Sequence, residues 1–356
     1  KNWSAEALDD NSLTLDYAVY SCDRVGEKGT GAIPVIEIQR YLNEWKYDGP
    51  LSLKYPFKVD GLEKGRKVLL VMEYPERCKI KVNGKEVEYD GLPAWRDFRW
   101  MPIDISKHIV QGDNAIELYY QNFKHGDPTI VKPAFERYGT EIESIYLVGD
   151  FSVSAQATGE HPVQGAFKTF ALNAPKGEGL RRDSLALCPP RAISKDKGDV
   201  SLQGLPFYTG KLKYSASIRD LKVPHGARAI VEIDSLGCPV AEVVVNGRRA
   251  GILQSHPLRV DITDCMAGDI TNIDIILYAS LRNLLGPHHN KQGELAACGP
   301  TDFYSRFTHS PNLHEIKEKL DKWGRGEFLP KDWNDGYCVH SLGEIGDVRL
   351  KLVTRQ

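Results

Sequence analysis

Apolar residues in this chain alternate with polar ones over short stretches, which is the period of a β-strand. The clearest example surrounds the dipeptide Asn246-Gly247, which favours the positive φ angles of a tight hairpin turn. Alternating runs continue beyond the hairpin, with apolar positions at Leu258, Val260, Ile262, Ile273, Ile275 and Leu277. This pattern predicts antiparallel strands that bury one face in a hydrophobic core.

A series of short markers occurs twice in the same order, and such self-similarity indicates a repeated architecture. The markers are LKY at 53–55 and 212–214, VNG at 82–84 and 245–247, Asp104-Ile105 and Asp261-Ile262, Gly112-Asp113 and Gly268-Asp269, AIEL at 115–118 matched with 273–276, and the closing runs 141–147 and 344–350. The second copy is longer between its last markers. This places an insertion at about 279–340, a loop excursion of the kind that the ends of a sandwich tolerate.

We therefore predict an all-β fold of two tandem jelly-roll β-sandwiches. The first module spans 11–155, a connector with the leading strand of the second module spans 156–203, and the second module spans 204–356. Asn312 followed by Glu315 is a capping pattern, so the insertion is predicted to hold the only firm helix, at 312–323. The stretch 36–45 fits a strand or a short helix, and residues 1–12 are expected to be frayed.

Composition excludes several classes of protein. The chain has 46 basic and 48 acidic residues, a formal net charge of −2, so no bulk electrostatic attraction favours nucleic acid. No apolar run is long enough to span a membrane. The seven cysteines are odd in number and widely spaced, which argues against a disulfide framework or a zinc knuckle and leaves the compartment open.

Three segments carry a likeness to a known family. They read VNGRRAG at 245–251, PLRVDITD at 257–264 and SLRNLLGPHH at 280–289. Their order resembles the galactose-binding-like β-sandwich modules, called sugar-binding domains, of family 2 glycoside hydrolases, and especially the paired sandwiches of large bacterial α-L-rhamnosidase-like glycosidases of family 106. The resemblance covers about 204–290 and, more weakly, 51–153. It implies a bacterial, extracytoplasmic accessory portion whose catalytic carboxylates lie in a separate barrel domain of the same parent protein.

Carbohydrate recognition uses flat aromatic faces together with planar polar groups. Trp95 and Trp100 flank Arg96 on a predicted loop and fit that description, although the tryptophans could equally cap the core. Trp333 and Tyr337 flank a predicted turn and form a second candidate platform, with core packing as the alternative.

Polar residues of the insertion are further candidates. Arg282, Asn283 and Asp302 suit sugar hydroxyls, and loop hydrogen bonds are the alternative. His288 and His289 follow a Gly-Pro turn and are predicted to form a structural pair or to contact a sugar or a neighbouring domain. A metal interpretation would also recruit Cys298, His309 and His314, but zinc needs three or four converging ligands and the spacing is not standard. We expect no metal, with a structural calcium ion as the open alternative. The carboxylates at repeated positions are Asp104, Asp113, Asp261 and Asp269.

No catalytic residue can be nominated. The chain lacks the G-x-S-x-G, H-E-x-x-H and Gly-rich phosphate-loop motifs, and glycoside hydrolysis needs two carboxylates that the sequence does not single out. Three hypotheses follow, each with carbohydrate or a catalytic domain of the same parent protein as partner. The chain is a non-catalytic carbohydrate-binding portion of a glycoside hydrolase acting on plant or host glycans, a fragment that completes a glycosidase active site, or a scaffold that packs on a catalytic barrel.

Overall fold

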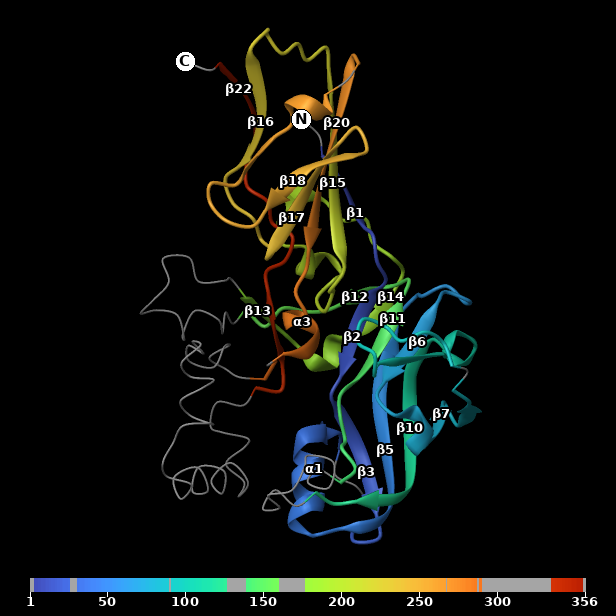
Figure 1. The fold of residues 1–356 in the computed structure, drawn as a ribbon. Helices are drawn as coiled ribbons and strands as arrows, with labels where there is room; N and C mark the ends of the chain where they lie inside the picture. The colour runs from blue at the N-terminus through green and yellow to red at the C-terminus, as the bar shows by residue number, and fades with distance from the viewer. Residues whose placement is uncertain are drawn as a thin grey trace, which may run out of the picture.

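A computed structural model describes residues 3–25, 31–89, 91–126, 139–159, 177–266, 268–286, 288–289 and 334–354 of the chain. Strands dominate these residues and form two stacks of sheets that follow one another along the molecule (Figure 1). The predicted all-β fold is confirmed. The domain bounds derived from the sequence stay a prediction.

The first sandwich packs a larger sheet on a smaller one. The larger sheet consists of β12 (Ser152–Ser154), β14 (Ala186–Cys188), β5 (Asp48–Val59), β10 (Gly112–Lys124), β7 (Lys79–Val82) and β8 (Lys85–Val87), with β3 (Tyr17–Cys22) beside β5 and β4 (Ile33–Pro34) beside β3. The smaller sheet consists of β2 (Asn11–Leu15), β11 (Ile145–Gly149), β6 (Val68–Met72) and β9 (Met101–Asp104). Leu53 from one sheet and Leu70 and Leu147 from the other share a single buried core.

The second sandwich repeats this plan with fewer strands. One sheet consists of β1 (Ser4–Ala7), β15 (Lys211–Arg219), β20 (Ile270–Tyr278), β17 (Val240–Val245) and β18 (Arg248–Leu253), and the other of β19 (Arg259–Asp261), β16 (Ala227–Ile233) and β22 (Val348–Thr354). Its core is a separate cluster. The expectation that residues 1–12 are frayed is wrong, because Ser4 and Ala7 of β1 pair with Ser215 and Leu212 of β15, about 200 positions away.

Both Asn-Gly hairpins form at the predicted positions. Asn83 and Asn246 adopt φ angles of 53° and 50°, and each is followed by a glycine with positive φ. The Asn83 Oδ1 accepts a hydrogen bond from the amide of Ala115, and the Asn246 Oδ1 accepts one from the amide of Asn272. Ala115 therefore corresponds to Asn272, and the AIEL marker at 115–118 matches 272–275 instead of the predicted 273–276. A slip of one residue would send every side chain of the strand to the opposite face.

Helices are few. The stretch 36–45, which fitted a strand or a short helix, is helical as far as Glu44 and forms part of the helix α1 (Val35–Glu44). Val35, Ile38 and Leu42 form its buried face. The helix predicted at 312–323 lies outside the described residues, and α1 shows that it is not the only helix. α3 (Arg282–Leu285) is a single turn, and β13 (Gly177–Leu180) pairs with β21 (Tyr337–His340). Short 3₁₀ turns are η1 (Pro75–Arg77), η2 (Ser106–His108), η4 (Arg182–Ser184), η5 (Lys195–Lys197), η6 (Val200–Gln203) and η7 (Thr263–Cys265).

Buried hydrogen bonds join the first sandwich to segments from the second half of the chain. The Asn11 side chain donates to the carbonyls of Phe151 and Gly204, each at 3.0 Å, and the Ser12 hydroxyl donates to the carbonyl of Phe207 at 2.6 Å. Phe207, Leu284, Tyr337 and Val339 all pack in the core of the first sandwich. Segments from the end of the chain therefore help to build its first half.

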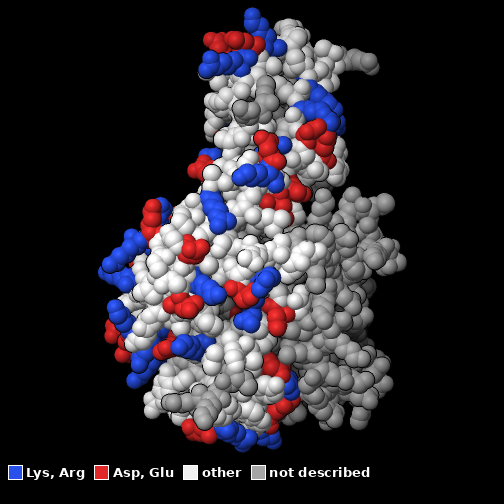
Figure 2. Space-filling view, turned by 180° about the vertical axis from the view of Figure 1, so that it is seen from behind, with Lys and Arg blue, Asp and Glu red and all other residues white. Residues whose placement is uncertain are grey.

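The outer surface mixes both signs of charge. Figure 2 shows Lys and Arg side chains interspersed with Asp and Glu over the visible face. Within the described ranges, no helix has the length and apolar character that crossing a membrane would require.

Candidate functional site

A gap in the larger sheet of the first sandwich borders a cavity. β3 pairs with residues 51–54 of β5, and β14 pairs with β5 at Val59. Residues 55–58 between these points pair with β10 on one side, and on the other side no strand of the described chain accompanies them. Pro56 suits this position because it has no backbone N–H to leave unpaired. A cavity of about 680 Å³ lies here, within the size range of small-ligand sites.

The cavity wall combines apolar and polar side chains from six segments. Apolar residues of the wall include Leu13, Leu15, Phe57 and Leu185. Polar and charged groups come from Asp16, Tyr17, Lys54, Lys58, Asn83, Asp113, Asn114, Glu117, Arg182, Asp183 and Tyr337. Such a mixture suits a ligand that presents both hydroxyl groups and C–H surface.

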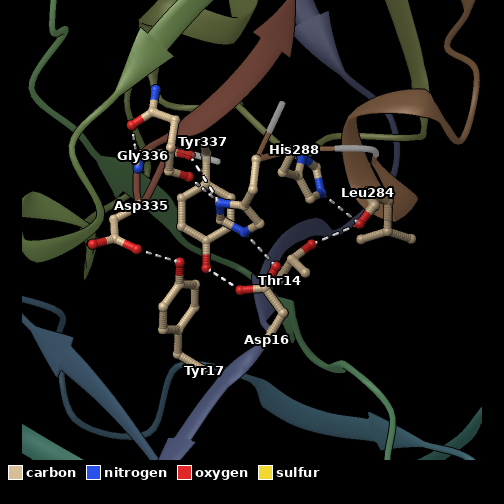
Figure 3. Close-up of polar contacts among 10 residues, drawn as sticks. Thr14, Asp16, Tyr17, Leu284, His288, Asp335, Gly336 and Tyr337 are labelled. Carbon is tan, nitrogen blue, oxygen red and sulfur yellow. Dashed lines mark hydrogen bonds and ion pairs between the residues drawn. The ribbon is translucent and has the colours of Figure 1, made fainter. Parts of the chain in front are cut away.

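Asp16, in the cavity wall, is the centre of a buried polar network (Figure 3). It lies between β2 and β3, where it interrupts a run of buried residues. Its Oδ2 lies 2.9 Å from Nε2 of His289, and its Oδ1 accepts a hydrogen bond from the Tyr337 hydroxyl at 2.5 Å. Burial alone would raise the pKa of Asp16. The hydrogen bond and positive charge of His289, with the Tyr337 hydroxyl, outweigh burial and lower this pKa below its usual value.

His289 is held in its charged form. Its Nδ1 lies 2.9 Å from the carbonyl oxygens of both Asn334 and Gly336, while its Nε2 faces Asp16. Both ring nitrogens therefore face acceptors, and only an imidazolium donates from both. Burial opposes the charged form, but the hydrogen bond and charge of Asp16 raise the pKa of His289 above its ordinary value. The pair is a buried ion pair.

The preceding histidine has the opposite protonation state. Burial is the main cause that lowers the pKa of His288 to about 4, so its imidazole is neutral at pH 7. Its Nε2 donates to the Leu284 carbonyl at 3.2 Å, and the Thr14 hydroxyl donates to the same oxygen at 2.8 Å (Figure 3). These contacts attach α3 to β2, and they give His288 a structural place in the core.

Of the other candidates from the insertion, some have structural roles and the rest lie outside the described residues. Asn283 is buried, and its amide exchanges two 2.8 Å hydrogen bonds with the backbone of His340, as one strand would with another. Arg282 is partly buried at the start of α3. Asp302 and Trp333 lie outside the described residues, and so do three members of the metal hypothesis, Cys298, His309 and His314. Among the residues that the structure describes, no group of three or more potential ligands could hold a metal ion.

The tryptophan candidates lie apart from the cavity. Trp95 and Trp100 stack with ring centroids 5.7 Å apart, and Trp100, 8% exposed, also packs on Tyr146 in the core. The Arg96 guanidinium lies over the outer tryptophan, 5.1 Å from the Trp95 ring centroid. None of these three residues lines the cavity. Trp95 with Arg96 stays a predicted sugar platform.

Two of the repeated carboxylates have the same local role. Asp104 accepts hydrogen bonds from the amide and hydroxyl of Ser106, and Asp261 accepts both from Thr263 at equal distances of 2.9 and 2.6 Å. These bonds close the turn after each strand. Asp113 lines the cavity, and Asp269 accepts through its backbone carbonyl from Asp220. The calcium alternative stays an untested expectation.

Sequence reasoning found Tyr337, His288 and His289 but missed their partners. Asp16 and Tyr17 lie some 270 to 320 positions away, and Arg182 lies in a connector without periodicity. The one available signal was Asp16 itself, a charged residue between Leu15 and Tyr17 in an otherwise buried run. Because a charge is rarely buried without a partner, a buried Asp16 predicts a side chain of opposite charge or a hydrogen-bond donor beside it.

Comparison with known proteins identifies no family. No protein-family model and no curated protein matches the chain. Among solved structures, the chain is similar to a glycosyl hydrolase family 2 member from Bacteroides cellulosilyticus (10% identity, 76% of this chain and 32% of that chain, TM-score 0.28) and to a β-glucuronidase from Ruminococcus gnavus (11%, 79% and 44%, TM-score 0.29). A rhamnosidase from Novosphingobium sp. PP1Y also matches (15%, 79% and 21%, TM-score 0.22).

The chain spans less than half the length of each of these three solved proteins. With TM-scores below 0.3, the similarity carries no argument about the activity of this chain.

Proposed function

We propose that this chain is a non-catalytic, carbohydrate-binding portion of a glycoside hydrolase, and that carbohydrate binds in the cavity beside β5. The observation that carries the proposal is the cavity itself, about 680 Å³, with apolar residues and polar side chains in one wall. A sugar presents hydroxyl groups and C–H faces together, so it can use both kinds of surface. The glycoside hydrolase context comes from the resemblance of segments 245–251, 257–264 and 280–289 to sugar-binding modules.

Two carboxylates of the cavity wall, Asp16 and Asp183, are unsuited to acid catalysis. A general acid in glycoside hydrolysis needs a raised pKa, whereas that of Asp16 is lowered by His289 and Tyr337 despite its burial. Both oxygens of Asp16 already accept hydrogen bonds. Asp183 is exposed and forms an ion pair with Arg181. Neither carboxylate is placed to donate a proton to a leaving group.

Hydrogen exchange in the presence of a glycan panel tests the proposal without disturbing the buried network. We expect a bound oligosaccharide to slow amide exchange at 54–58, 113–117 and 181–185, the segments around the cavity. Protection of 91–100 instead would place binding at the Trp95 platform and contradict the cavity assignment. A full panel without protection at either place would contradict carbohydrate binding and leave the hypotheses of a scaffold and of a fragment that completes a glycosidase active site.

A matched pair of variants distinguishes binding in the cavity from binding at the Trp95 platform. Replacing Lys58 by Ala removes a side chain from the cavity wall, and we expect the sugar Kd to rise several-fold because hydrogen bonds from a charged group are lost. Trp95→Ala is the control, because Trp95 lies outside the cavity, and we expect the Kd to stay unchanged. The opposite result from isothermal titration calorimetry would favour the loop platform.

A further inference from the structure

Arg182 stands out among the charged residues described in the cavity wall because one of its donor atoms is buried and has no hydrogen-bond partner. Its guanidinium lies 4.2 Å from the centroid of the Tyr17 ring, and its Nε is buried without a hydrogen-bond partner. In the part of the chain that the structure describes, no carboxylate lies within ion-pair distance of it. The preceding arginine differs, because Arg181 makes two hydrogen bonds to Asp183, from Nε at 3.1 Å and from Nη2 at 2.7 Å.

The charges of the two strands at the cavity wall face each other in pairs. Lys54 of β5 lies opposite Glu117 of β10, and Lys58 lies opposite Asp113. Cross-strand partners of opposite sign attract and reduce each other's effect on a ligand.

The remaining acidic groups of the cavity are also matched by positive charge. Asp16 is compensated by the buried imidazolium of His289, and Asp183 by Arg181. Of the three cationic side chains that the structure describes in the cavity wall, Lys54 and Lys58 lie opposite carboxylates in the strand register, whereas Arg182 has no such cross-strand partner. A fixed guanidinium in a partly enclosed site is suited to bind a carboxylate through two parallel hydrogen bonds.

We propose that the cavity selects a carbohydrate carrying a carboxylate, a uronic acid residue, and that Arg182 binds this group. The inference rests on the proposed carbohydrate-binding function and adds the class of sugar. The contact of the guanidinium with the Tyr17 ring restricts its motion, so less conformational freedom is lost when the ligand binds. One such guanidinium suits a single carboxylate. The neutral balance of the other charged groups does not favour a densely anionic glycan.

The test compares sugars that differ only in charge. Disaccharides of galacturonate and of glucuronate are titrated by calorimetry beside their methyl esters, which keep the shape and lose the charge. We expect at least one acid to bind about tenfold more tightly than its ester, and only the acid to weaken as salt is raised. Arg182→Gln should abolish the difference, whereas Arg349→Gln in the second sandwich should leave it unchanged because Arg349 belongs to an exposed ion pair outside the cavity wall.

The titrations distinguish failure of the uronic acid assignment from failure of the proposed function. Esters or neutral sugars that bind as tightly as the acids would overturn the assignment to uronic acids and leave the proposed function intact. Absence of binding by every sugar would contradict the proposed function itself. If the Arg182→Gln variant does not fold, the salt dependence of the acid and ester for the unaltered chain still decides, since equal dependence overturns the inference.

Discussion

The two sandwiches share a plan of strands and differ in what surrounds it. In the first, Ile103 faces Leu70, which faces Leu147; in the second, Val260 faces Val231, which faces Leu350. The order β3-β5-β10-β7-β8 likewise corresponds to β1-β15-β20-β17-β18. The same pattern of alternating residues therefore produces the same sheets twice.

The difference between the sandwiches lies in the added segments. β2 forms the edge beside β11 in the first sandwich, and no strand of the described chain occupies the corresponding edge of β22 in the second. The first sandwich also receives α3, the two histidines and β21 from the second half of the chain, together with the ion pair between Asp16 and His289. The candidate site thus depends on the added segments more than on the shared sheets, and three measurements can test this distinction.

The largest expected effect comes from breaking the buried ion pair. Asp16 and His289 are 12% and 7% exposed, so removing one partner leaves a buried charge uncompensated. We expect His289→Ala to lower the free energy of unfolding by about 3–5 kcal/mol, measured by urea denaturation. Arg349→Ala in the second sandwich is the control, because its exposed pair with Asp234 should cost less than about 1 kcal/mol. Equal losses would remove the distinction between the sandwiches.

The adjacent histidines make stability depend on pH from both sides. The pKa of His289 is raised in the folded state, so its contribution is complete below pH 6.5 and is lost as pH rises through the folded pKa. The pKa of His288 is lowered to about 4, so stability falls as pH drops from 6.5 toward 4, by about 3 kcal/mol. Protonation of Asp16 lowers stability further as pH falls below its ordinary pKa of 3.8, because its pKa in the folded protein is lower than that value.

Stability should therefore be greatest near pH 6.5, as measured by urea denaturation across pH 4–9. His288→Asn should flatten the acidic side of this profile, and His289→Gln the alkaline side. A profile that both substitutions leave unchanged would contradict the assigned charges.

The smallest effect should distinguish the two hairpins. The side chain of Asn83 is half-buried and hydrogen-bonds to His108, Asn114 and Ala115, whereas exposed Asn246 hydrogen-bonds to Cys265 and Asn272. Each bond contributes about 0.5–1.5 kcal/mol, so we expect Asn83→Ala to cost about 2–3 kcal/mol and Asn246→Ala about 1–2 kcal/mol. Thermal unfolding of the two variants gives the comparison. A greater loss at Asn246 would reverse it.

The sequence by itself determined the strands and their turns. Alternation with a period of two appears in any short window, and Asn-Gly turns act within four residues, so β7, β8, β17 and β18 were all predictable. The sequence also singled out His288, His289 and Tyr337. Their surroundings were not predictable, because residue type alone does not tell a buried histidine from a ligand-binding one.

Only the tertiary structure decided the candidate site. Asp16, Arg182, His289 and Tyr337 meet because β2, η4, α3 and β21 converge on one sandwich from distant parts of the chain. No local pattern encodes that convergence, since it depends on which apolar faces find each other after the strands have formed. The protonation states of the two histidines follow from the same packing. Two neighbouring residues of one type, His288 and His289, became neutral and charged because only the second faces a carboxylate and two carbonyls.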